Sequence, residues 1–150
     1  MKPLKVLIVY FSQTGKTKKQ AEKLAKETGG DLYEIKPLHP YTEEDLDWHN
    51  ENSRVYRESM DLDCRPEIVD EPLDVSQYND IYLGFPIWCH TAPSVVCTFL
   101  EKHDFSEKKV KVFATSGNGV FGRALQAVGP NLHGGRVYEY SMNGKFGWWS

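Results

Sequence analysis

The sequence predicts a doubly wound α/β fold, a three-layer sandwich in which helices cover both faces of a parallel sheet. Short runs of β-branched, aromatic and aliphatic residues alternate with amphipathic segments of helix length. The apolar runs are nearly continuous, which is typical of strands buried on both faces. With 150 residues, of which 40% are hydrophobic, the chain is expected to form one domain over residues 1–150.

Five strands and three helices are expected in alternation. The strands are Leu4–Tyr10, Leu32–Ile35, Asp80–Phe85, Lys109–Ala114 and Val137–Tyr140. The helices are Thr17–Glu27, Pro93–His103 and Phe121–Val128. The first helix places Ala21, Leu24 and Ala25 on one face, and Gly29-Gly30 marks its end. This alternation predicts right-handed βαβ crossovers.

The segment 37–76 shows no strong strand pattern. Thr42 and Asp45 have the spacing of a capping box, and Glu43–Met60 is expected to form one or two helical turns. A connection of this length between strands usually holds a crossover helix or a functional loop.

Charge and cysteine content exclude several classes of protein. The net charge of −3 divides into +5 over residues 1–30, −11 over 31–80 and +3 over 81–150, which argues against a uniformly basic nucleic-acid binder. No apolar run approaches the roughly 20 residues of a membrane span. Cys64, Cys89 and Cys97 form no CxxC pair, so neither a disulfide framework nor a zinc site is expected. A reducing cytoplasm fits this pattern best.

The turn after the first strand is rich in hydroxyls and precedes a helix. Its residues are Ser12, Gln13, Thr14, Gly15, Lys16 and Thr17. Free backbone N–H groups and the helix dipole favour an anion there, typically phosphate. An ordinary Ser/Thr-capped turn is the alternative interpretation. A nucleotide P-loop is excluded because it needs a glycine where this sequence has Tyr10.

The turn after the third strand holds a tryptophan between two prolines. Pro86, Ile87 and Trp88 lead toward Pro93 in a loop that proline stiffens. A rigid indole at this edge suits stacking on a flat aromatic cofactor. Alternatively, Trp88 anchors the loop against the core. His90 alone is typical of a surface histidine.

The turn after the fourth strand is glycine-rich. It runs through Thr115, Ser116, Gly117, Asn118, Gly119 and Gly122, and spells G-x-G-x-x-G. A dinucleotide-binding fingerprint is disfavoured, because that fingerprint follows the first strand, whereas this turn follows the fourth. It also needs an acidic residue roughly 20 positions on, and the best available match is Glu139 in the last strand. The glycines more simply allow close approach to a flat ligand. The three turns meet at one sheet edge, and FMN is the simplest cofactor that fits all of them.

These three motifs, in this order, resemble the flavodoxin family. The closer resemblance is to short, flavodoxin-like bacterial proteins with a P-I-W…A-P loop, whose long acidic connection carries motifs matched here by Pro40-Tyr41 and Arg65-Pro66-Glu67-Ile68. The resemblance covers residues 4 to about 140. It implies a five-stranded parallel sheet of order 2-1-3-4-5, with FMN at the switch point between the first and third strands.

The resemblance also implies roles for individual residues. Ser12, Thr14, Gly15, Lys16 and Thr17 would hold the phosphate, with Gln13 contributing its backbone. Pro86, Ile87 and Trp88 would flank the isoalloxazine, and Thr115 through Gly119 with Gly122 would line its far side. A peptide flip at Gly117 or Gly119 would respond to the redox state of the flavin.

Two features depart from the family pattern. The segment Gly144–Ser150 is not expected to form a helix, so the usual C-terminal helix is missing. Two interpretations stay open: the chain is truncated, or its last apolar residues cover the exposed face or a partner. The total charge is also less negative than is usual in flavodoxins.

The resemblance implies an FMN-binding electron-transfer protein that shuttles electrons between redox protein partners. It involves no nucleic acid, no membrane, no metal and no catalytic side chain. The alternative is an FMN-dependent NAD(P)H:quinone, nitro or azo reductase. A third possibility is a binding module that has lost FMN. The sequence leaves open whether the protein is a monomer or a dimer.

Overall fold

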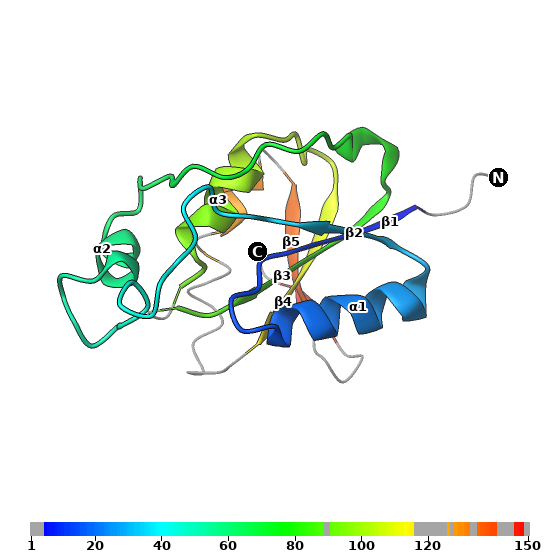
Figure 1. Ribbon diagram of the computed structural model, residues 1–150. Helices are drawn as coiled ribbons and strands as arrows, with labels where there is room; N and C mark the ends of the chain where they lie inside the picture. The colour runs from blue at the N-terminus through cyan, green and yellow to red at the C-terminus, as the bar shows by residue number, and fades with distance from the viewer. Residues whose placement is uncertain are drawn as a thin grey trace.

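A six-stranded sheet forms the centre of the molecule (Figure 1). The computed structural model describes residues 5–88, 91–115, 126, 128–132, 135–140 and 146–148. The strand order is β2-β1-β3-β4-β5-β6. The strands are β1 (Val6–Tyr10), β2 (Asp31–Glu34), β3 (Asp80–Pro86), β4 (Lys109–Thr115), β5 (Arg136–Tyr140) and β6 (Phe146–Trp148). The first five are parallel, which confirms the predicted order 2-1-3-4-5.

The sixth strand was not predicted. Phe146–Trp148 pairs antiparallel with β5 at the edge of the sheet. The expectation that this segment is not a helix is therefore correct for residues 146–148. This backbone pairing satisfies one edge of β5. The expectation that the last apolar residues cover the exposed face or a partner stays a prediction.

Helices lie on both faces of the sheet, as the sequence predicts. They are α1 (Lys16–Thr28), α2 (Arg54–Met60) and α3 (Ser94–Glu101), with short 3₁₀ turns η1 (Val75–Gln77) and η2 (Gly129–Leu132). Figure 1 shows α1 below the sheet and α3 above it. Of the predicted helix 121–128, Gln126 and Val128 are the described residues, and both are helical.

The alternation of side chains along β1 builds two cores. Ile8 and Tyr10 pack with Ala21 and Leu24 of α1 in the smaller core. Leu7, Val9 and Phe11 face the larger core, which also contains the buried face of α3. Both faces of the strand are apolar because both are covered, which is the physical reason for the nearly continuous apolar run.

One glycine in the sheet is required by close packing. A Cβ atom on Gly84 of β3 would lie 2.2 Å from Cζ of Phe113 on the neighbouring strand β4. The Phe113 ring therefore crosses β3 where only glycine leaves room for it, which ties the two central strands together.

The long connection between β2 and β3 runs out from the sheet and back. Leu38 donates its N–H to the carbonyl of Glu67, and Val69 donates to Lys36, so the outgoing and returning arms pair near the sheet. Between these arms the connection carries α2 (Figure 1). The sheet thus supports an extended flap of chain at its carboxyl edge.

The prediction of one or two helical turns within 43–60 is confirmed by α2, which lies at the end of that segment. The N–H of Asp45 donates to Thr42 Oγ1 at 3.1 Å, and the N–H of Thr42 donates to Asp45 Oδ2 at 3.0 Å, which is the reciprocal geometry of a capping box. A turn follows this box rather than a helix. The helix begins only at Arg54, where Ser53 caps it by accepting from the N–H of Tyr56.

In the described part of the chain, no helix combines the length and apolar character needed to cross a membrane.

Candidate functional site

The turn after β1 leads into helix α1, whose N-terminus has no side-chain cap. The N-cap residue is Gly15, which is left-handed at φ 94° and offers no side-chain acceptor. Its own N–H donates to Ser12 Oγ at 3.1 Å. The first turn of α1 contains no acidic residue. The unsatisfied N–H groups and dipole of this 13-residue helix therefore favour an external anion, the geometry that the predicted phosphate site requires.

The turn after β3 fixes the backbone of Trp88. Trp88 and Thr91 exchange two backbone hydrogen bonds, each of 2.9 Å. Cys89 and His90, between them, lie outside the described residues. Because Ile87 before this turn is buried, the loop is anchored to the core. The predicted rigidity of this loop thus comes from tertiary burial and paired bonds as well as from proline.

The indole of Trp88 is held edge-on by two aromatic rings. Its centroid lies 5.3 Å from that of Phe11 and 5.0 Å from that of Tyr41, with interplanar angles of 89° and 77°. These T-shaped contacts are favourable aromatic geometries and leave part of the indole uncovered. Trp88 therefore anchors the loop, as the alternative interpretation holds, and still lines the site.

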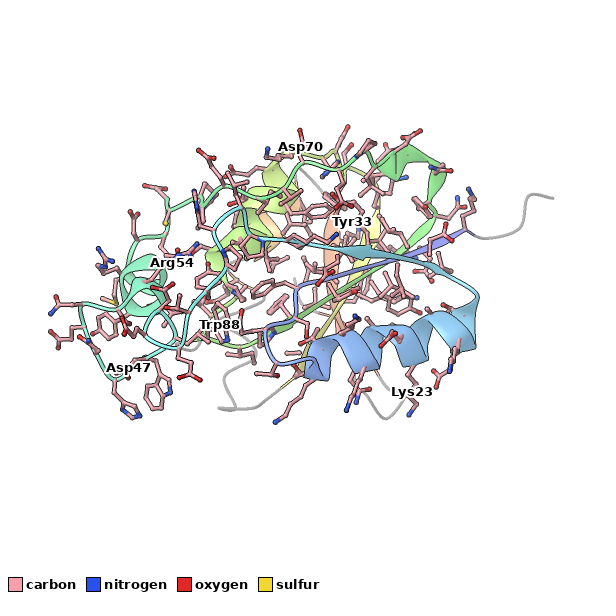
Figure 2. The ribbon with its side chains drawn as sticks, in the orientation of Figure 1. Lys23, Tyr33, Asp47, Arg54, Asp70 and Trp88 are labelled. Atoms are coloured by element: carbon pink, nitrogen blue, oxygen red, sulfur yellow. The ribbon has the colours of Figure 1, made fainter. Side chains whose placement is uncertain are left out.

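A partly buried polar cluster of Arg54 and Glu58 contacts Tyr41. Its hydroxyl donates to Glu58 Oε1 at 2.6 Å, and Arg54 Nε lies 2.9 Å from Glu58 Oε2. The Arg54 guanidinium also stacks 3.8 Å from the centroid of the Tyr41 ring. Burial, and then the Glu58 carboxylate, raise the pKa of Tyr41 far above its ordinary value, so it stays protonated. Figure 2 shows Arg54 on α2, on the same side of the molecule as Trp88.

The same tyrosine reaches the phosphate turn. Gln13 Nε2 donates to the carbonyl oxygen of Tyr41 at 3.3 Å. Tyr41 consequently links the turn after β1, the indole wall and helix α2. Sequence reasoning used Tyr41 only as a family motif and missed this supporting role, because it depends on contacts between segments distant in the sequence.

A hydrogen bond joins the first and third predicted turns. The hydroxyls of Thr17 on α1 and Thr115 at the end of β4 lie 2.6 Å apart. Thr17 is buried, so its hydroxyl is committed to this bond inside the protein. This contact brings the start of α1 to the carboxyl end of β4.

These segments enclose a cavity of about 270 Å³ at the carboxyl edge of the sheet. The predicted site residues that line it are Gln13, Thr14, Lys16, Thr17, Pro86, Ile87, Trp88 and Thr115. Ser12 and Gly15 are not among its lining residues; Ser12 braces the turn and Gly15 caps the helix. The predicted Ser116, Gly117, Asn118, Gly119 and Gly122 lie outside the described residues.

Three further residues line the cavity and were not predicted. Leu46, Trp48 and Val55 reach it from the long connection. A tryptophan within an acidic stretch was the one available signal, since Trp48 follows several carboxylates. No periodicity connects these residues with the three turns, because the fold of the connection alone places them there.

The residues of this cavity suit anion binding beside an aromatic wall. Within the described ranges, no three His, Cys, Asp or Glu side chains gather as metal ligands would. The cavity lining includes lysine and threonine side chains at the start of α1 and the indoles of Trp48 and Trp88. This donor set suits a flat organic group that carries a phosphate.

Comparison with known proteins identifies the family. The flavodoxin family model matches residues 5–145. The chain belongs to the flavodoxin family. No curated protein matches it significantly.

Solved structures of flavodoxin-like proteins share this fold. A protein from Bacteroides eggerthii that has been assigned as a flavoprotein is 41% identical, with a TM-score of 0.80, over 89% of this chain and 87% of that one. A similarly assigned protein from Bacteroides uniformis is 40% identical, with a TM-score of 0.80, over 92% of each chain. A flavoprotein from Lactobacillus acidophilus, solved in complex with FMN, is 25% identical, with a TM-score of 0.67, over 91% of each chain.

Proposed function

We propose that this member of the flavodoxin family binds FMN and transfers electrons between redox partners. The observation that carries the proposal is the cavity itself, which joins an uncapped helix N-terminus to a fixed indole wall. The FMN complex of the Lactobacillus acidophilus protein supports the choice of cofactor.

Different residues would contact the phosphate and the ring system of the cofactor. The N–H groups at the start of α1, with Thr14 and Lys16, would bind the phosphate. Trp88, Pro86 and Ile87 would flank the ring system, and Leu46, Trp48 and Val55 would limit access of water from the side of the long connection. When bound, FMN supplies one- and two-electron redox chemistry. No side chain of this site has to act as an acid, base or nucleophile.

The cofactor proposal is tested on purified protein by absorption spectroscopy and by titration of flavin-free protein. We expect flavin absorption bands and a preference for FMN over riboflavin, because the site is built around an anion. Protein that remains colourless and takes up no FMN would overturn the proposal and favour a binding module.

Electron transfer and reductase activity are separated by a second experiment. A carrier should oxidise NADPH only slowly in the presence of a quinone, although its reduced flavin should pass electrons to a redox protein. Rapid NADPH oxidation by the purified protein would instead assign it as a reductase.

A further inference from the structure

A second, larger cavity lies beside the first, between α2 and α3. It is a groove of about 730 Å³, and we call it the α2–α3 groove. One wall is formed by α2 and the segment after it, from Tyr56 to Arg65, and the other by the start of α3 with residues near η2. Trp48 lines both cavities, so the groove meets the candidate flavin cavity at this indole.

The apolar surface of the groove is unusually exposed. Trp48, Met60 and Leu62 have exposed fractions of 52%, 71% and 79%, the three highest among large apolar residues in the described part of the chain. All three line this one groove. Large apolar side chains gathered at one exposed place are typical of an interaction site, and methionine adapts readily to a partner surface.

The unpaired charge of the groove is negative. Glu58 is paired with Arg54, and Arg65 with Glu101, so these two lining residues are neutralised within the protein. Among the described residues, the carboxylates of Asp61 and Asp63 take part in no ion pair. An occupant that combines an apolar group with positive charge is therefore complementary to this surface.

Arg65 gives the groove a fixed end. Its guanidinium donates to Glu101 Oε1 at 2.7 Å, to Asn131 Oδ1 at 3.3 Å and to the carbonyl oxygen of Leu62 at 2.9 Å. These bonds tie the segment after α2 to α3 and to η2. The part of the groove at Arg65 is thus held by several partners, and Trp48 is the residue that the groove shares with the candidate flavin cavity.

We propose that the α2–α3 groove docks the redox partner, through a partner surface that presents an apolar group among lysine or arginine side chains. The proposal deepens the proposed function and rests on it. A protein is favoured over a small molecule because Met60 and Leu62 project largely into solvent, whereas small-molecule pockets bury most of their ligand. An occupant here would lie next to Trp48, at the entrance to the flavin cavity.

The test measures binding of a basic redox protein by isothermal titration calorimetry. Zinc-substituted cytochrome c is the probe, because its apolar porphyrin edge is surrounded by lysines and its metal does not change redox state. We expect binding at low ionic strength that weakens with added salt. The absorption spectrum of the same sample reports FMN content, so failure of docking and failure of FMN binding are seen separately.

Two double variants test the apolar and the charged parts of the groove. Met60→Ser/Leu62→Ser should weaken binding by about tenfold, since apolar contacts at the centre of an interface carry much of its affinity. Asp61→Asn/Asp63→Asn should slow association and reduce the dependence of binding on salt. All four residues are exposed, so neither variant is expected to disturb folding.

Val69→Ser/Asp70→Asn is the matched control. It also removes an exposed apolar side chain and a neighbouring carboxylate from the same connection, but neither residue lines the groove. Figure 2 shows Asp70 well separated from Arg54 and α2. This variant should bind the probe as the original protein does.

Three outcomes would overturn the proposal. The first is no binding of zinc-substituted cytochrome c to the original protein at low ionic strength. The second is an equal loss of binding in the groove and control variants. The third outcome uses a second probe, methyl viologen, which is a small flat dication. If the groove variants lose binding of methyl viologen but still bind zinc-substituted cytochrome c normally, the groove is a small-molecule site.

Discussion

Single residues at the carboxyl edge of the sheet combine structural contacts with a place in the candidate cofactor cavity. Trp88 lines the candidate cofactor cavity while its ring packs against Phe11 and Tyr41. Thr17 lines the same cavity, yet its hydroxyl is bonded to Thr115. Thr14, in contrast, lines the cavity on an exposed part of the turn. Substitutions at these positions should therefore separate cofactor binding from stability.

Replacement of Thr14 tests the phosphate site. Thr14→Ala should weaken FMN binding by about tenfold, because it removes a hydroxyl donor to a charged oxygen. Riboflavin affinity should change much less, since riboflavin has no phosphate. Titration of flavin-free protein with both ligands measures the difference. An equal loss for both ligands would show that Thr14 does not contact the phosphate.

Replacement of Tyr41 tests the cluster behind Trp88. Tyr41→Phe removes the 2.6 Å hydrogen bond to the partly buried Glu58 carboxylate and should cost about 1–3 kcal/mol of unfolding free energy. Tyr33→Phe is the matched control, because the Tyr33 hydroxyl donates to a neutral carbonyl oxygen, that of Glu71, at 3.2 Å. Urea unfolding compares the two, and an equal or larger loss in the Tyr33 variant would argue against the cluster.

The raised pKa of Tyr41 predicts how stability depends on alkaline pH. In the unfolded chain tyrosine ionises near pH 10, whereas in the folded protein burial and Glu58 keep Tyr41 protonated. The unfolded state therefore binds fewer protons above about pH 10, and the free energy of unfolding should fall as the pH rises there. Tyr41→Phe should make this fall less steep in urea unfolding between about pH 9 and 11. An unchanged slope would show that Tyr41 ionises normally.

At the scale of the elements, helix α1 contributes to the candidate site through its N-terminus. Lys16 and Thr17 at this end line the cavity, whereas no residue at the other end of the helix does so. Its two ends are nevertheless alike in local geometry. Gly15 and Gly29 are both left-handed, at φ 94° and 73°, and a Cβ atom at either would meet nothing within 4 Å. They therefore form a natural matched pair for separating helix stability from anion binding.

Alanine at these two glycines should have one shared effect and one distinct effect. Gly15→Ala and Gly29→Ala should each lower the free energy of unfolding by about 1 kcal/mol, from backbone strain rather than steric overlap. Only Gly15→Ala should also weaken FMN binding, because it disturbs the turn that presents the N–H groups of α1. Similar FMN affinities in the two variants would place the phosphate elsewhere.

At the scale of the whole molecule, opposite charges are separated along the chain. Residues 1–30, which include α1, carry +5, and residues 31–80, which include the long connection, carry −11. Figure 2 shows Lys23 on the exposed side of α1 and Asp47 on the flap that holds α2, at different ends of the molecule. A basic partner should therefore be steered toward the flap, although the total charge is only −3.

The edge strand β6 also acts at this scale. Deletion of residues 141–150 would remove the strand that pairs with β5 and would leave backbone groups of β5 without partners. We expect a lower free energy of unfolding and more self-association than in the full chain, measured by urea unfolding and sedimentation velocity. Sedimentation and stability equal to those of the full chain would show that β6 does not protect this edge.

Local patterns in the sequence predicted those parts of the structure that depend on neighbouring residues. The strand at Val6–Tyr10 could be recognised because burial on both faces demands a continuous apolar run. The helix at Lys16–Thr28 could be recognised from its apolar stripe and its terminal glycines. Strand β6 was missed because Phe146–Trp148 has three residues with a glycine at the centre, too short a segment to show a pattern.

The sequence by itself determined the parallel sheet and the turns after β1 and β3 that line the candidate cofactor cavity. It determined the strand order through the family resemblance. Only the tertiary structure decided that Trp48 closes the same cavity, that Tyr41 braces Trp88, and that Met60 and Leu62 share a groove with α3. The physical reason is the range of the interactions. Strand and helix patterns follow from neighbours a few residues apart, whereas these contacts join segments that only the folded connection brings together.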